Sequence, residues 1–198
     1  MLTPKPADIE RKRFGAWLAI TAVLIATVLL LRAEGRSWIC SCGKLSVWAG
    51  EICSASNSQQ FLDPYSFTHV LHGFVYAWLL ALLATRAPRL TTAWQFSFAV
   101  TLGSLWELLE NSDFIINRYR IETAALGYQG DTIVNSLGDL LCAVAGFVVA
   151  RQLGCRRSLV LFLVIELVLL IWIRDSLLLE TVMLIHPVGA IKAWQMCH

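Results

Sequence analysis

Histidines and acidic residues stand three residues apart inside stretches of the sequence that are otherwise apolar. His69 and His72 form one such pair, and Glu107 and Glu110 form another. Residues three or four positions apart share one face of a helix, so each pair would present its side chains together. Imidazole and carboxylate groups are ligands for zinc, manganese and iron, and a carboxylate also serves as a general base.

A third polar stripe enters another apolar stretch, where Asp131, Asn135 and Asp139 follow one another at intervals of four residues. Ionisable groups inside membrane segments are costly and mark functional sites by default. The alternative interpretation is that these side chains lie at the level of the lipid headgroups and only bond neighbouring loops. Counted at a rise of about 1.5 Å per residue, the polar groups of four segments fall in one layer near one membrane surface.

These residues predict a water-accessible site that opens to the periplasm and holds a divalent metal such as zinc, manganese or iron. The sequence contains no complete metalloenzyme signature such as H-E-x-x-H. The predicted roles are metal binding for His69, His72 and Asp131, catalysis for Glu107, Glu110 and Asp139, and substrate binding for Asn135 and Arg174. Arg174 is included because a guanidinium group binds phosphate well.

The elements that must position these side chains are membrane-spanning helices. Hydrophobic residues make up 57% of the 198 residues, charged residues only 15%, and the mean hydropathy is +0.63. About 20 apolar residues are needed to cross a bilayer as a helix. Five segments approach that length, at residues 14–31, 67–85, 90–106, 132–150 and 158–173. We therefore expect an all-α, polytopic bundle of about five spans that forms a single domain over residues 1–198.

The distribution of lysine and arginine predicts how this bundle is oriented. Cytoplasmic loops near span ends carry the excess of positive charge, and the basic cluster at residues 11–13 precedes the first span. We expect the N-terminus in the cytoplasm, the C-terminus in the periplasm, and the first span to remain as an uncleaved anchor. Residues 176–185 are too short to cross the membrane and either extend the fifth helix or lie at the interface.

Four cysteines fall on the predicted periplasmic side, where disulfides form. Cys40, Cys42 and Cys53 lie in the outer loop at residues 32–66, and Cys197 lies near the C-terminus. Four cysteines allow three pairings, and the sequence does not choose among them. The alternative is that the Cys40-Ser41-Cys42 segment binds a soft metal such as Cu(I) through its thiolates.

Several motifs resemble those of a known family. The segment at residues 57–73, the Trp106-Glu107 pair and the segment at residues 127–139 are similar to an uncharacterised family of proteobacterial inner-membrane proteins. This resemblance covers nearly the whole chain and implies a multi-pass protein of the inner membrane. The order of polar residues is more distantly similar to VanZ-like proteins, which would match Asp63, His69, Glu107, Asp131, Asn135 and Gly138. The lysine that usually follows the aspartate in VanZ is missing after Asp63.

Three functions fit these observations. The first is a membrane-embedded enzyme that acts on a lipid-linked or envelope substrate. The second is a proton-coupled transporter that uses Asp139 and Glu166 near the middle of the bilayer. The third is a non-enzymatic envelope component whose outer loop binds a partner. The net charge of +2 argues against nucleic acid as a partner, and the lipid bilayer is the one partner that the sequence predicts.

Overall fold

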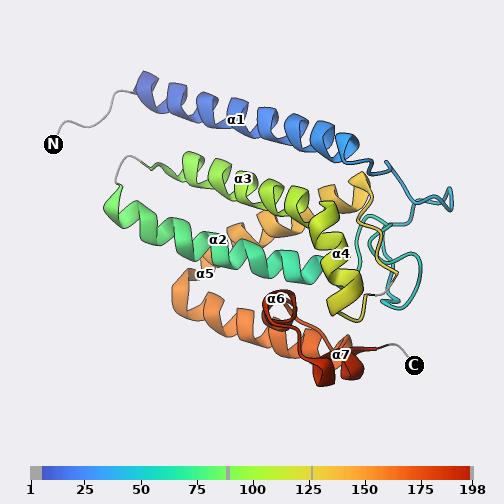
Figure 1. Cartoon of the computed structure of the whole chain (residues 1–198). Helices are drawn as coiled ribbons and strands as arrows, with labels where there is room; N and C mark the ends of the chain where they lie inside the picture. The colour runs from blue at the N-terminus through green and yellow to red at the C-terminus, as the bar shows by residue number, and fades with distance from the viewer. Residues whose placement is uncertain (1–5, 88–89, 126, 197–198) are drawn as a thin grey trace.

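The computed structural model describes residues 6–87, 90–125 and 127–196, and within them the chain is all-helical (Figure 1). Its helices are α1 (Pro6–Ala33), α2 (Ser66–Arg86), α3 (Thr92–Glu110), α4 (Asp113–Glu122), α5 (Ile133–Trp172), α6 (Leu177–Ile185) and α7 (Gly189–Gln195). The part of the chain that the structure describes contains one isolated β-bridge, between Trp48 and Leu62, and no strand. The predicted all-α fold class is therefore confirmed.

The bundle is organised around the contact between α2 and α5, while α1 packs along α3 on the outside (Figure 1). Glycines bring α2 and α5 together. A Cβ atom added to Gly73 would lie 2.0 Å from the carbonyl oxygen of Ala143, and one added to Gly146 would lie 2.0 Å from that of Val70. The two backbones thus approach more closely than any side chain allows, which is the usual role of small residues between membrane helices.

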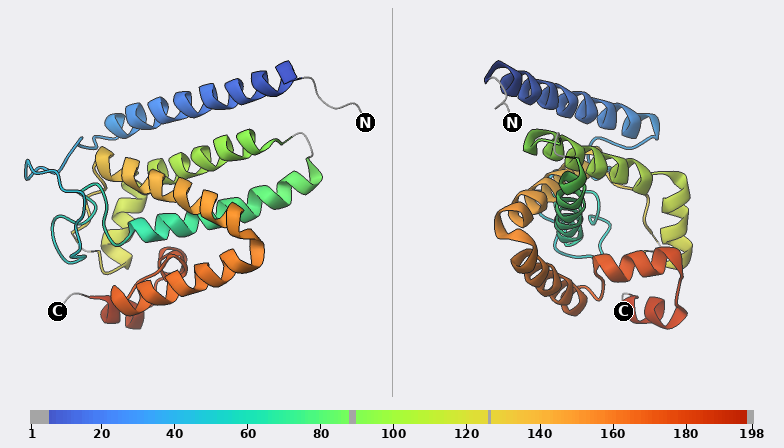
Figure 2. Two further views of the ribbon diagram at one scale, coloured as in Figure 1. Left: turned by 180° about the vertical axis from the view of Figure 1, so that it is seen from behind. Right: turned by 90° about the vertical axis from the view of Figure 1, so that its left-hand side faces the viewer.

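The helix α5 is bent at Gly154, where φ is 73° and ψ is 170°. Positive φ is a conformation that glycine adopts readily and other residues rarely. The bend divides α5 into two arms, and the second arm returns toward the end of the bundle where the first arm begins, as seen from behind in Figure 2. The fourth and fifth predicted segments, residues 132–150 and 158–173, correspond to these two arms.

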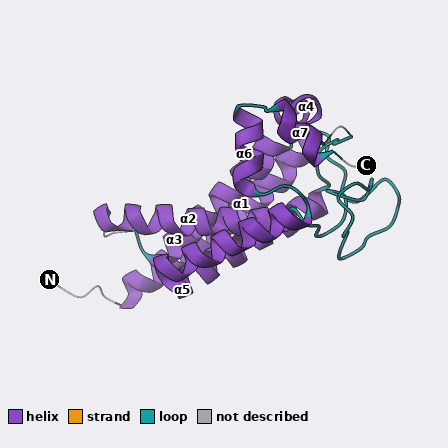
Figure 3. Cartoon of the chain, turned by 90° about the horizontal axis from the view of Figure 1, so that it is seen from below, coloured by secondary structure: helices purple, strands orange, loops and turns teal. Residues whose placement is uncertain are grey.

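The loops and the short helices gather at one end of the bundle. Figure 3 shows the long outer loop, α4, α6 and α7 at the end opposite the N-terminus, together with the C-terminal end of the chain. The helix α6 does not continue α5, because α5 ends at Trp172 and residues 173–176 are not helical. The side chain of Ser176 caps the new helix by accepting a hydrogen bond from the backbone N–H of Leu179. One polar end therefore collects residues from across the sequence.

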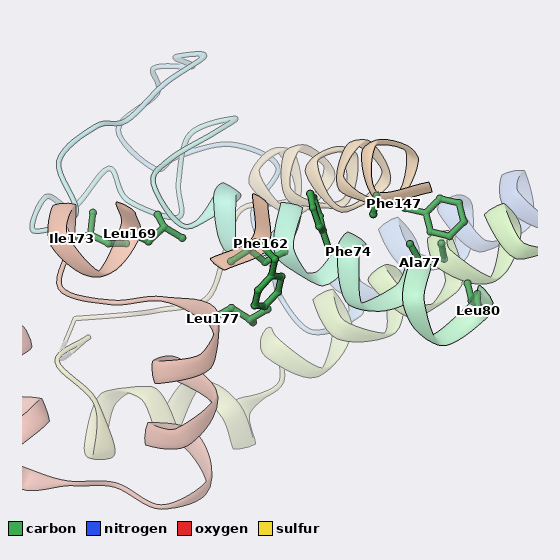
Figure 4. Packing of buried hydrophobic residues seen from close by; sticks show 11 residues of the cluster. Phe74, Ala77, Leu80, Phe147, Phe162, Leu169, Ile173 and Leu177 are labelled. Carbon is green, nitrogen blue, oxygen red and sulfur yellow. The ribbon is translucent and has the colours of Figure 1, made fainter. Parts of the chain in front are cut away.

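The apolar core runs between α2 and the two arms of α5 (Figure 4). Phe74 of α2 lies against Phe162 of the second arm with ring centroids 6.5 Å apart, and both side chains are buried. Leu177 extends the cluster to α6. This packing fixes the second arm and α6 beside α2, the helix that carries His69.

Two of the described helical segments, Glu10–Ala33 and Ser66–Arg86, are long and apolar enough to cross a membrane. Large hydrophobic side chains are also exposed on other helices. Leu105 of α3, Leu141 in the first arm of α5 and Ile171 in the second are each more than half exposed.

Among the predicted cysteines, Cys40 and Cys42 are joined to each other by a disulfide. Cys53 also takes part in a disulfide, and Cys197 lies outside the described residues. Cys142 and Cys155 are free thiols, and Cys155 is exposed near the bend of α5.

Candidate metal centre

His69 of α2 lies at the centre of a buried cluster of carboxylates. Its Nδ1 atom is 3.2 Å from Oε1 of Glu107, and its Nε2 atom is 3.9 Å from Oε2 of Glu110. One ligand atom from each of the three residues can be chosen so that all lie within 4.8 Å of one another. Two atoms bonded to one zinc ion at about 2.1 Å lie at most roughly 4.2 Å apart. A small inward movement of the side chains would therefore bring all three ligand atoms within bonding distance of one ion.

The cluster is desolvated and carries unused acceptors. The side chain of Glu107 is 1% exposed, that of His69 is 7% exposed and that of Glu110 is 12% exposed. The Oε2 atoms of both glutamates are buried without a hydrogen-bond partner. Buried polar atoms are nearly always paired, so these two oxygens mark a position where a cation is favourable.

Asp139 reaches the same histidine from α5. Its Oδ2 atom is 3.8 Å from Nε2 of His69, and its Oδ1 atom accepts a hydrogen bond of 2.6 Å from the hydroxyl of Ser66. Three helices therefore supply the polar groups around His69. The Ser66 contact holds one oxygen of Asp139 in place and leaves the other facing His69.

A cavity of about 100 Å³ opens onto this cluster from the polar end of the bundle. His69, Glu110 and Asp139 lie in its wall, beside residues of the outer loop, α4, α6 and α7. No lysine or arginine among the described residues lines it.

Asp131 and Asn135, two of the predicted site residues, belong to a hydrogen-bonded network next to the centre. Asp131 accepts hydrogen bonds from Nδ2 of Asn111 (2.9 Å) and from the hydroxyl of Tyr128 (3.0 Å). Burial raises the pKa of Asp131 to about 7, and these two hydrogen bonds oppose the shift. Asn135 donates a hydrogen bond of 2.8 Å to the backbone oxygen of Gln60 and so ties α5 to the outer loop.

His72 was predicted as a metal ligand beside His69, but the structure turns it away from the carboxylates. Its ring stacks on Tyr76 with an angle of 6° between the ring planes, and its centroid is 4.8 Å from that of Trp106. Its Nδ1 atom is buried without a hydrogen-bond partner. Residues three apart on a helix differ in direction by about 60°, and here that angle separates a polar neighbourhood from an aromatic one.

Arg174 and Glu166 also lie apart from the cluster. The guanidinium of Arg174 donates a hydrogen bond of 3.2 Å to the backbone oxygen of Trp194, and the residue is not part of the cavity wall. Glu166 accepts a hydrogen bond of 3.3 Å from the backbone N–H of Leu178. A carboxylate at the beginning of a helix is favourable, so Glu166 anchors the N-terminal end of α6 to the second arm of α5.

The cavity contains a second polar group that the sequence analysis did not assign to the site. Asp175 accepts hydrogen bonds from the hydroxyl of Tyr65 (3.5 Å) and from the side chain of Gln195. Burial and the neighbouring Glu180 raise the pKa of Asp175 to about 8. Tyr119 donates a short hydrogen bond to Glu180. These residues follow the last predicted span or lie in short connecting segments, where hydrophobic periodicity gives no signal.

Comparison with known families gives a match over most of the chain. The family model described as "Protein of unknown function (DUF2585)" matches residues 31–197. No solved structure matches.

Relatives in several proteobacteria cover nearly the whole chain. A "UPF0314 protein" of Brucella anthropi is 39% identical over 186 residues, which are 94% of this chain and 92% of the relative. Another in Paracoccus denitrificans is 40% identical over 190 residues, 96% of this chain and 97% of the relative. A third, in Novosphingobium aromaticivorans, is 41% identical over 187 residues, 91% and 92% of the two chains. The predicted resemblance to an uncharacterised proteobacterial family is confirmed, whereas the comparisons do not show the likeness to VanZ-like proteins.

Proposed function

The chain belongs to the DUF2585 family of proteins of unknown function, and we propose that it is a multi-pass inner-membrane metalloenzyme whose divalent metal is held by His69, Glu107 and Glu110. The observation that carries this proposal is the convergence of these three side chains within 4.8 Å in a desolvated position that faces a cavity. Its substrate is a component of the cell envelope or a lipid-linked molecule that enters from the periplasm.

Five membrane spans explain why so many large hydrophobic side chains of the bundle are exposed. Besides α1 and α2, the helix α3 and both arms of α5 expose large hydrophobic side chains, which a bilayer would cover. With the N-terminus in the cytoplasm, an odd number of spans brings the outer loop, α4, α6 and α7 to the periplasmic side. The Cys40–Cys42 disulfide supports this orientation, because disulfides persist in the periplasm and are rare in the cytoplasm.

The donor set favours a metal over a bare ion pair. One imidazole cannot neutralise two buried glutamates and the adjacent Asp139, and buried charges without a partner are strongly unfavourable. A divalent cation would coordinate the two unpartnered glutamate oxygens and offset the excess negative charge of the carboxylates. One imidazole with two carboxylates suits zinc, manganese or iron.

Three protein ligands leave open positions on the metal, as catalytic sites do. A metal bound there would lower the pKa of a coordinated water. Asp139 lies on the cavity side of His69 and is placed to accept the proton from that water. The chemistry that this arrangement supports is hydrolysis of a bond in the bound substrate.

Metal analysis of the purified protein tests this proposal. We expect about one divalent ion per chain after loading with zinc, manganese or iron and removal of the excess. His69→Ala and Glu107→Gln should lose most of that metal. His72→Phe, which keeps the aromatic packing with Trp106, should retain it, and so should the control Glu122→Gln on α4.

Equal metal content in the wild type and in His69→Ala would contradict the proposal. Loss of metal in His72→Phe, with correct folding, would restore His72 as a ligand and change the donor set.

A structural role for the same polar groups is the second candidate function. The network of Asp131, Asn111 and Asn135 ties α3, α5 and the outer loop together through buried hydrogen bonds. If the wild type binds no metal and alanine substitutions in the cluster lower only the thermal stability, this non-enzymatic role is the correct one.

A further inference from the structure

The cavity has a second end, away from His69, where α6 and α7 meet the start of α2. Tyr65, Asp175, Glu180 and Gln195 lie in this part of the wall. We propose that this end binds a primary ammonium group of the substrate. The inference rests on the proposed function and adds the charge class of the molecule that the metal centre acts on.

The charge of the wall is the first argument. Five carboxylic acids line the cavity: Glu110, Asp131, Asp139, Asp175 and Glu180. The described part of the chain places no lysine or arginine against them in the wall. An anionic group such as a phosphate would be repelled by each of these groups that is ionised, whereas a cation would be attracted to it and would favour its ionised form.

The hydrogen-bonding groups give an independent argument. Gln195 is 8% exposed, and its Oε1 atom has no hydrogen-bond partner. Its amide lies against Asp175 and lowers the pKa of that carboxyl group, as a donating amide nitrogen does, which leaves the oxygen without a partner. In the outer loop, Oδ1 of Asn57 is also buried, unpartnered and in the cavity wall. The unpartnered atoms of the wall, together with Oε2 of Glu110, are therefore all acceptors, and the ligand must bring donors.

An ammonium group has the donors that these acceptors need. It carries three N–H bonds and no acceptor, so it can satisfy the amide oxygen of Gln195 and a carboxylate oxygen of Asp175 or Glu180 together. The tyrosines at positions 65, 119 and 128 add aromatic surface to the wall, and aromatic rings attract organic cations. The aromatic rings of the wall favour an organic cation at this end over a strongly hydrated metal ion.

A series of three four-carbon molecules tests the charge class directly. Butylammonium, butanol and butyrate have similar size and differ in their polar end, which is positive, neutral or negative. Binding is measured as the rise of the melting temperature with ligand concentration, in detergent at pH 7 and constant ionic strength. Since a ligand that binds the folded state stabilises it in proportion to the logarithm of its concentration, the three curves give apparent affinities. We expect the melting temperature to rise with the logarithm of the butylammonium concentration and to stay unchanged with butyrate.

Variants locate the binding to this end of the cavity. Asp175→Asn and Glu180→Gln should each weaken butylammonium binding by about tenfold or more, which corresponds to at least about 1.4 kcal/mol. The matched control is Glu122→Gln, which removes an acidic group of α4 that pairs with Arg118 outside the cavity wall, and it should bind as the wild type does. Metal content is measured in every variant, because Asp175 and Glu180 are not metal ligands and their variants should keep the ion.

Equal stabilisation by butylammonium, butanol and butyrate would overturn the inference, and so would unchanged binding in both variants. These outcomes are separable from failure of the metal site. If the protein holds metal and shows no preference for butylammonium, only the ammonium site is wrong. If it binds butylammonium and holds no metal, the metalloenzyme is wrong while the cationic subsite stands.

Discussion

Asp175 shows how one carboxyl group in the cavity wall couples the stability of the protein to pH. It faces the carboxyl group of Glu180, the hydroxyl of Tyr65 and the amide of Gln195. Its pKa is about 8 in the folded protein against 3.8 for the free side chain, with burial as the largest cause. The folded state therefore binds one more proton than the unfolded state between these two pH values.

We expect Asp175→Asn to flatten the dependence of stability on pH. A raised pKa contributes stability that is fully present below about pH 4 and is lost as the pH rises through about 8. Asparagine keeps the shape and does not ionise, so the variant should lose less stability than the wild type between pH 5 and pH 9. The measurement is the melting temperature in detergent across that range, without ligand.

The Glu122→Gln variant serves as the comparison for Asp175→Asn, since Glu122 is partly exposed and lies outside the cavity wall. If the melting temperatures of the wild type and Asp175→Asn change in parallel from pH 5 to pH 9, Asp175 is ionised throughout this range and its environment is more polar than that of a buried carboxyl group.

At the scale of the helices, the contact between α2 and α5 sets the position of His69 relative to Asp139. Gly73 lies one turn along α2 from His69, at a point where the backbone of α5 leaves no room for a side chain. The added Cβ of an alanine would lie 2.0 Å from the Ala143 oxygen and 2.5 Å from the Phe147 nitrogen, both backbone atoms that cannot rotate away.

Gly73→Ala should therefore separate the two helices and lower the free energy of unfolding by roughly 1–3 kcal/mol or more, as overpacking does. The control is Gly189→Ala, because nothing lies within 4 Å of a Cβ at that position. Melting temperature and metal content are measured for both. A Gly73→Ala protein as stable as Gly189→Ala would show that α2 and α5 are not in backbone contact.

The helices were more predictable from the sequence than the site was. All five predicted segments fall on helices, because runs of apolar residues between charged turns carry a strong signal. The pairing of Glu107 with His69 was within reach of the sequence, since both are polar residues deep in apolar segments. The aromatic surroundings of His72 were not, because they depend on how α3 is rotated about its own axis. Asp175 and Glu180 were missed because only the folding back of α6 brings them to the cavity.

At the scale of the whole molecule, the bend at Gly154 lies at the end of the bundle opposite the cavity. In the five-span arrangement this bend faces the cytoplasm, and Cys155 beside it is an exposed free thiol. Chemical labelling of Cys155 therefore shows on which side of the membrane the bend of α5 lies.

We expect a membrane-impermeant maleimide to label Cys155 only from the cytoplasmic side. Sealed spheroplasts should show no labelling, and inverted vesicles or detergent-opened membranes should be labelled. Cys155→Ser provides the control, because it removes this thiol and leaves the disulfide-bonded cysteines of the outer loop unchanged. Labelling of Cys155 in sealed spheroplasts would contradict the proposed topology and would mean that the cavity opens to the cytoplasm.

The division of the cavity between early and late parts of the chain has a consequence for biogenesis. The groups around the proposed metal position come from α2, α3 and the first arm of α5, whereas Asp175, Glu180 and Gln195 of the opposite wall follow the second arm of α5. During synthesis the ribosome completes the first set well before Glu180 and Gln195 emerge. In the proposed metalloenzyme, a metal ion can therefore reach His69 while the site is still open, before the last two helices enclose it.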